Sequence, residues 1–139
     1  MTTLKRFYNY SYDRRISAIS MDPRFILIGQ TDGRVSVHYL YNGVRAFESQ
    51  VSESSISAVC CEEHDDIHNE IFYVTDNKNK LFVLNKKGSV LAVGELEDEM
   101  GKVNTIVNQR RFVLLVHTCL GSVTFKFNQE FQIFCALCF

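Results

Sequence analysis

The sequence repeats one arrangement of short apolar runs and turns three times. Each unit opens with an apolar residue, a polar residue, a small or polar residue and another apolar residue, at 16–19, 56–59 and 103–106. Two longer apolar runs follow in each unit, at 25–29 and 34–39, at 71–74 and 80–84, and at 112–116 and 122–127. Turn residues separate the two runs at 31–33, 76–79 and near Gly121. Short runs rich in Val, Ile, Phe and Tyr between clusters of Gly, Asn and Asp predict β-strands throughout.

The spacing of the units predicts the architecture. Val35, Leu81 and Val123 hold equivalent places in the units, separated by 46 and then 42 residues. A period of roughly 40–45 residues with four strands per unit is typical of a β-propeller blade. Fourth, outer strands are expected at 44–51, 89–96 and 131–139. We therefore expect an all-β fold of about three four-stranded antiparallel blades, at 16–51, 56–96 and 103–139, within one partial propeller domain over 1–139, with 4–10 as an outer strand of another blade.

The strand pattern also predicts which side chains are buried. Val35 and Val37 point to one face, and the polar residues between and beside them point to the other, so one face is expected to be buried and the other less so. The run at 25–28 is apolar on both faces, as for a strand covered on both sides. Asp32-Gly33 is a hairpin signal, because Gly accepts the positive φ of the turn.

Three blades do not close a ring, because each blade covers the next and the end faces stay open. We expect the chain to be a shortened form of a longer propeller protein. Open apolar faces are expected to drive self-association or aggregation.

The stretch from Asp32 to Gly43 resembles the end of a WD repeat. That family has the core pattern Asp-Gly-x-Val-x-Val-Trp-Asp-x-x-Thr-Gly, which matches here at Asp32, Gly33, Val35, Val37 and Gly43. Departures from the pattern are His38 and Tyr39 at the Trp-Asp place, Asn42 at the Thr place, and Leu84-Asn85 and Lys126-Phe127 in the second and third units. The resemblance is to a divergent WD-repeat-like β-propeller and covers residues 4–128.

Divergent repeats of this kind are similar to the N-terminal propellers of HOPS-type vesicle-tethering subunits and related scaffold proteins. The resemblance implies a non-catalytic protein–protein interaction scaffold in vesicle-mediated transport, bound to other proteins of a multisubunit complex. It implies a cytoplasmic location, peripheral on endosomal or lysosomal membranes through those partners. Two alternatives stay open: a structural subunit of a nuclear, kinetochore or ciliary assembly, and a small metal- or redox-responsive regulator.

Composition narrows the classes of function. The 15 basic and 16 acidic residues give a net charge of -1, without the basic excess that a nucleic-acid-binding protein normally carries. At 46% hydrophobic residues, intrinsic disorder is not expected. No apolar run reaches about 18 residues, so no transmembrane segment is expected. The N-terminus lacks the apolar core of a secretory signal, and the five cysteines, an odd number, favour a reducing compartment.

The densest group of chemically active residues lies between 60 and 68. Cys61, His64 and His68 have spacings that a zinc ion could use. Cys60 would point away from Cys61 on a strand, and no second ligand pair lies nearby. The favoured interpretation is the end of a strand followed by a solvated acidic loop, without a metal or other cofactor.

No catalytic motif is present, and we do not expect an enzyme. Cys135 and Cys138 form a Cys-x-x-Cys, but no helix follows to lower a thiol pKa, so buried strand cysteines are expected. His38 and His117 are expected to be packed in strands. The aromatic run at 7–12 is either an outer strand or a partner-binding surface; partner-binding residues are otherwise not assigned.

Overall fold

The computed structural model describes residues 14–61, 70–96, 101–109, 112–117, 121–127 and 133–138. Their strands form three four-stranded antiparallel sheets. The first sheet has the order β1 (Ile16–Met21), β2 (Phe25–Gln30), β3 (Arg34–Tyr39), β4 (Arg45–Gln50). The second has the order β5 (Ile56–Cys61), β6 (Phe72–Asp76), β7 (Lys80–Leu84), β8 (Val90–Glu95). The third has the order β9 (Val103–Gln109), β10 (Phe112–His117), β11 (Gly121–Phe127), β12 (Ile133–Cys138).

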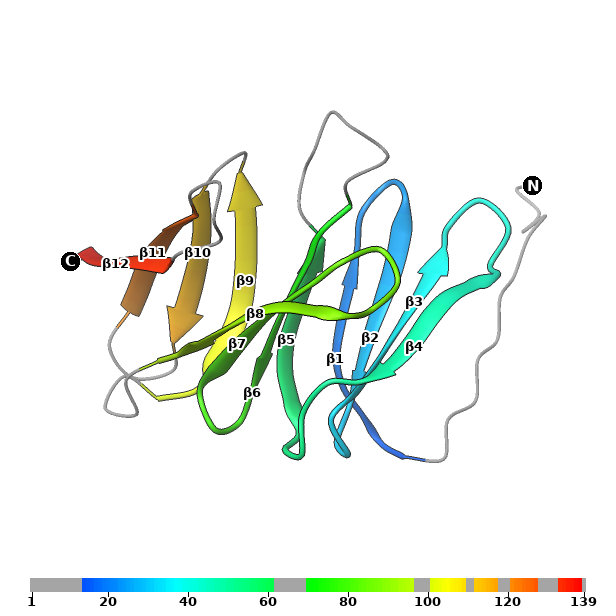
Figure 1. Cartoon of the computed structure of the whole chain (residues 1–139), viewed down its shortest axis with the longest axis horizontal. Coiled ribbons are helices and arrows are strands. Elements are labelled where there is room, and N and C mark those ends of the chain that lie inside the picture. The colour runs from blue at the N-terminus through cyan, green and yellow to red at the C-terminus, as the bar shows by residue number, and fades with distance from the viewer. Residues whose placement is uncertain are drawn as a thin grey trace, which may run out of the picture.

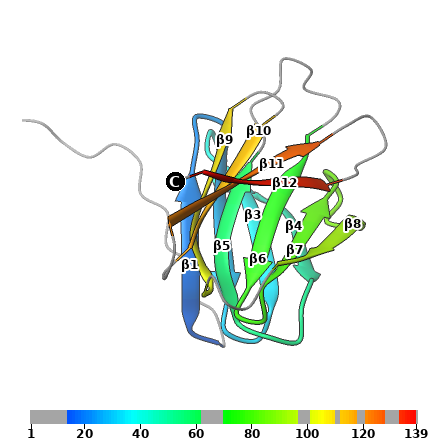
Figure 2. The same ribbon diagram turned by 90° about the vertical axis from the view of Figure 1, so that its left-hand side faces the viewer.

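The three sheets follow one another in a row along the molecule (Figure 1). The first strand of each sheet lies beside the first strand of the next, so that β1, β5 and β9 form an inner row. The outer strands β4 and β8 lie on the opposite side of the molecule (Figure 2). This arrangement brings equivalent residues of the three units onto one surface.

Two apolar cores hold the sheets together. The first lies between the first two sheets and is lined by Phe25, Leu27, Val35, Val37, Phe47, Ile56, Val59, Cys61, Phe72, Val74, Phe82 and Leu84. Phe72 contributes edge-on ring contacts to Phe25 and Phe47, with centroids 5.4 Å apart in each pair. The second core lies between the second and third sheets, where Tyr73, Leu81 and Val83 pack with Ile106 and Leu115. Each sheet is therefore stabilised mainly by its neighbour, because a single sheet leaves its apolar faces in water.

The units repeat in backbone detail. A register shift follows the first residue of both β1 and β5. A second shift lies between Val37 and His38 in the β3–β4 pair and between Val83 and Leu84 in the β7–β8 pair. The hairpins β2–β3 and β6–β7 make matching hydrogen bonds: the Gly33 N–H donates to the Gln30 carbonyl, and the Asn79 N–H to that of Asp76. Gly33 and Asn79 both have positive φ, 88° and 57°. The two hairpins thus have one geometry although their sequences differ.

The predicted all-β architecture of four-stranded antiparallel sheets is confirmed, with strands at the predicted places. One prediction about register is wrong. Val35 pairs with Gly29 in the first sheet, and Leu81 pairs with Thr75 in the second. The residue of the third sheet that corresponds to Gly29 and Thr75 is Val116, and it pairs with Ser122. Val123 therefore lies one residue beyond the place of Val35 and Leu81, although β3, β7 and β11 are matching strands. The reason is that hairpin length sets register, and a shift of one residue moves a side chain to the other face.

The burial predicted for β3 needs a second correction. Ser36 and His38 were expected on the less buried face, yet they are 0% and 5% exposed. Consecutive residues from Val35 to His38 are all buried, so β3 is covered on both faces. The expected outer strand at 4–10 lies outside the described residues.

Candidate functional site

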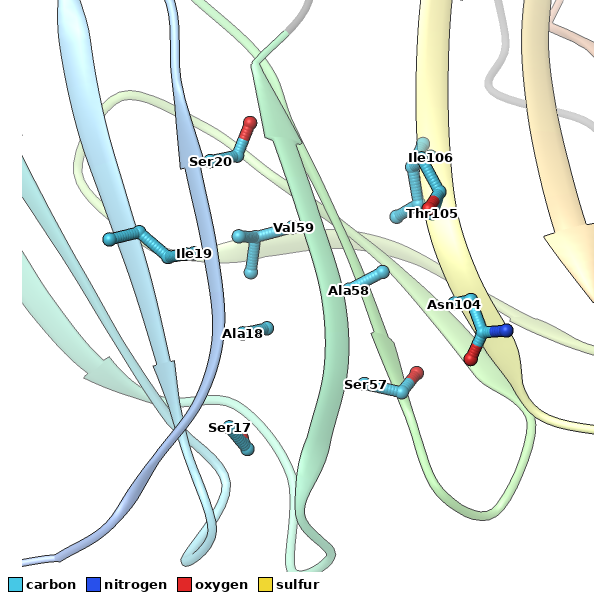
Figure 3. Close-up of a pocket in the computed structure, with 10 residues that line it drawn as sticks. All are labelled: Ser17, Ala18, Ile19, Ser20, Ser57, Ala58, Val59, Asn104, Thr105 and Ile106. Atoms are coloured by element: carbon cyan, nitrogen blue, oxygen red, sulfur yellow. The ribbon is translucent and has the colours of Figure 1, made fainter.

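A hollow opens along the inner row of strands. It has a volume of about 190 Å³ and is lined by Ser17, Ala18, Ile19 and Ser20 of β1, by Ser57, Ala58 and Val59 of β5, and by Asn104, Thr105 and Ile106 of β9. In Figure 3, Val59 points from β5 toward β1 and Ala58 points toward β9. Three places of the repeat supply lining residues in all three sheets, and Ser20 of β1 adds one more.

The chemistry of the hollow is that of short polar and small apolar side chains. Ser17 and Thr105 are exposed, and the Ser57 hydroxyl lies 2.9 Å from the Thr75 hydroxyl within the second sheet. Hydroxyl and amide groups can donate and accept hydrogen bonds, so the hollow can take up a polar backbone or side chain. None of these residues was predicted from the sequence as part of a functional site. The available signal was the polar residue after the opening apolar residue of each unit, at Ser17, Ser57 and Asn104.

A buried carboxylate joins the first two sheets at one end. Asp76 is 1% exposed, and its Oδ2 accepts a hydrogen bond of 2.6 Å from the hydroxyl of Ser52, which lies in the connection from β4 to β5. Its Oδ1 accepts hydrogen bonds from the backbone N–H groups of Lys78 and Lys80, both at 3.0 Å. Asp76 thus caps the β6–β7 hairpin and ties it to the segment that leaves the first sheet. From the sequence, Asp76 was predicted only to be part of a turn.

Cys61, which has a spacing to His64 and His68 that a zinc ion could use, makes other contacts in the structure. Its Sγ accepts a hydrogen bond of 3.3 Å from the Arg24 guanidinium, which also pairs with the Asp22 carboxylate at 3.1 Å. Burial, and then the negative charge of Asp22, raise the pKa of the Cys61 thiol far above its ordinary value, against the opposing charge of Arg24. A metal ligand must be a thiolate, so this environment opposes metal binding at Cys61.

The other two candidate residues, His64 and His68, lie outside the described residues. Within the described ranges no three His, Cys, Asp or Glu side chains are placed to hold a metal ion. Cys60 is half-buried and lies beside the second core, whereas Cys61 belongs to the first, so the two point in opposite directions as predicted.

His38 is buried within β3. Burial lowers the pKa of its imidazole from the ordinary value of 6.5, and the Arg45 charge adds to this, while the Gly43 backbone and Glu48 oppose it. His117 closes β10, and Cys135 and Cys138 lie in β12; their strands are described, and their predicted burial stays a prediction. The aromatic run at 7–12 lies outside the described residues.

No helix in the described part of the chain has the length and hydropathy needed to cross a membrane.

No protein-family model matches the chain. No curated protein has a significantly similar sequence.

Solved structures with a similar fold include two computationally designed proteins. The Ika4 protein superimposes with a TM-score of 0.65 at 14% identity, over 89% of this chain and 72% of Ika4. The Ika8 protein superimposes with a TM-score of 0.56 at 15% identity, over 83% of this chain. The chain spans only 34% of the length of Ika8. Both comparisons support sheets arranged as blade-like units resembling those of designed β-propeller-like repeats, and at these identities they concern the fold alone.

Proposed function

We propose that this chain is a non-catalytic protein-binding module formed by three blades of a WD-like β-propeller whose ring is incomplete. The observation that carries the proposal is the hollow along the inner strands, which equivalent residues of all three sheets build together. Rigid stacked sheets suit the docking of other proteins, because the binding surface costs little ordering when a partner arrives.

We propose further that the partners are subunits of a vesicle-tethering or related membrane-traffic complex. The support is the WD-like pattern of residues 32–43 together with the blade-like sheets. The chain would then be held at endosomal or lysosomal membranes through those partners.

The binding surface can be tested with two matched serine substitutions. Ser17→Arg places a long, charged side chain in the hollow from an exposed position of β1. Ser89→Arg makes the same change at an exposed position before β8, away from the hollow. Both chains are tagged in cells, and co-precipitation of tethering subunits and overlap with endosomal and lysosomal markers are measured.

We expect the unmodified chain and Ser89→Arg to bring down tethering subunits and Ser17→Arg to lose them while folding normally. Equal binding by both variants would reject the hollow as the docking surface. Absence of tethering subunits from every precipitate, with the tagged chain in the nucleus or at cilia, would reject the traffic assignment.

A further inference from the structure

Large apolar side chains are exposed on the first inner strand of the row. Ile19 and Met21 of β1 are 69% and 67% exposed. In Figure 3, Ile19 points from β1 away from β5, on the side opposite the neighbouring sheet. Apolar side chains this open to solvent, side by side on one strand face, indicate an interaction surface.

The repeat shows what normally covers these positions. The strand pairings align Ile19 with Val59 and Ile106, because each lies opposite the same place in the second strand of its sheet. Val59 and Ile106 are only 5% and 6% exposed, since each faces the inner strand of the preceding sheet. Met21 aligns in the same way with Cys61, which is 8% exposed. At the position of Ile19, therefore, the fold twice uses a preceding sheet as cover.

The other end of the row offers the matching surface. In the first two units, the residues that align with Thr105 and Val107 of β9 face the following sheet. Thr105 aligns with Ala18 and Ala58. Ala18 packs against the first core, and Ala58 lies in the second. Both β9 residues are exposed, Val107 at 48%.

Among the strands of the first sheet, the exposed large apolar side chains all lie on the inner strand β1. Ile28, Ser36 and His38 share the face of Ile19 by register, and they are already buried within the chain. An occupant therefore has to reach β1 rather than cover the whole sheet.

We propose that a second copy of this chain covers β1, with Thr105 and Val107 of one copy packed on Ile19 and Met21 of the other. The contact continues the one that joins β1 to β5 and β5 to β9 within the chain. It joins unlike ends, so two copies related by a twofold axis make it twice and leave neither end of the row open. This inference goes beyond the proposed function, and it rests on strand exposure and register rather than on any outside partner.

The test uses the whole chain and two opposite charges. Ile19→Glu and Val107→Lys each place a charge in the contact, and the double variant Ile19→Glu/Val107→Lys places the two charges opposite each other. Val93→Glu is the matched control, because Val93 is 53% exposed on β8, away from either end of the row. Mass in solution is measured by sedimentation and light scattering, and circular dichroism verifies that each variant is folded.

We expect the unmodified chain and the control to have twice the 16.0 kDa mass of one chain. Each single charge should weaken the dimer by at least about 30-fold, because an unpaired charge in an apolar contact is costly. The double variant should recover the dimer. A monomer at micromolar concentration, an open-ended series of larger species, or a dimer broken by Ile19→Glu but unaffected by Val107→Lys would overturn the proposal.

Discussion

Removing the buried Asp76 carboxylate is expected to lower the stability of the chain by several times the cost of a typical substitution in an exposed turn. The carboxylate is 1% exposed and accepts hydrogen bonds from Ser52, Lys78 and Lys80. In Asp76→Ala the Ser52 hydroxyl, in a residue that is 8% exposed, loses its buried acceptor, and two backbone N–H groups lose theirs. A hydrogen bond to a charged group contributes about 1.5–3 kcal/mol. The backbone N–H groups of Lys78 and Lys80 are only partly buried, so water can replace part of what they lose. We therefore expect a loss of about 3–5 kcal/mol in the free energy of unfolding.

The coupling between the two sheets can be measured separately. Urea unfolding of Asp76→Ala, Ser52→Ala and the double variant forms a double-mutant cycle, in which contacting residues give about 0.5–3 kcal/mol of coupling. Asp32→Ala is the control. The Asp32 carboxylate accepts a hydrogen bond from the exposed backbone N–H of Arg34 at 3.2 Å and pairs with its guanidinium at 3.5 Å, and losing these exposed interactions should cost under about 1 kcal/mol. A loss of less than about 1 kcal/mol for Asp76→Ala, or no coupling to Ser52, would refute the assignment of Asp76 as the link between the sheets.

Three further outcomes follow from the structure. Gly33→Ala should cost about 2 kcal/mol or more in urea unfolding, because Gly33 has a φ of 88° and an added Cβ would lie 1.8 Å from the Ser52 carbonyl oxygen. The free energy of unfolding should fall as the pH drops below the ordinary histidine pKa of 6.5. At these pH values His38 binds a proton in the unfolded chain, whereas in the folded chain its lowered pKa keeps it neutral to lower pH. Peptide-resolved maleimide labelling of the folded chain should modify Cys61 more slowly than half-buried Cys60, because burial raises the pKa of the Cys61 thiol.

Each of these has an outcome that would contradict it. Wild-type stability in Gly33→Ala would mean that the turn can move away from Ser52. In His38→Asn, the pH slope between 7 and 5 should become smaller than in the unmodified chain (pH values chosen around the ordinary histidine pKa); an unchanged slope would assign it to other groups. Equal labelling rates at the two cysteines would show that Cys61 is accessible in the folded chain.

The strands themselves could be predicted from local sequence. Alternating Val and polar residues at 34–38, β-branched runs and a glycine with positive φ at Gly33 are properties of adjacent residues, so they appear in the sequence directly. The repeat spacing added the grouping into four-stranded units. The register of β11 was missed by one residue, because apolar residues at Val123 and Phe125 suggested an alignment that the hairpin length does not allow.

The sites depended on residues that are distant along the chain. Ser52 meets Asp76 across 24 residues, and Arg24 meets Cys61 across 37, and no local pattern marks either pair. The hollow is likewise built by three strands that only the stacking of sheets brings side by side. Local periodicity, through the backbone preferences of neighbouring residues, thus determined where the strands lie. Sheet stacking decided which equivalent side chains are covered. Ile19 and Val59 hold the same place in the repeat, but only Val59 packs against a preceding sheet, so Val59 is buried and Ile19 is exposed.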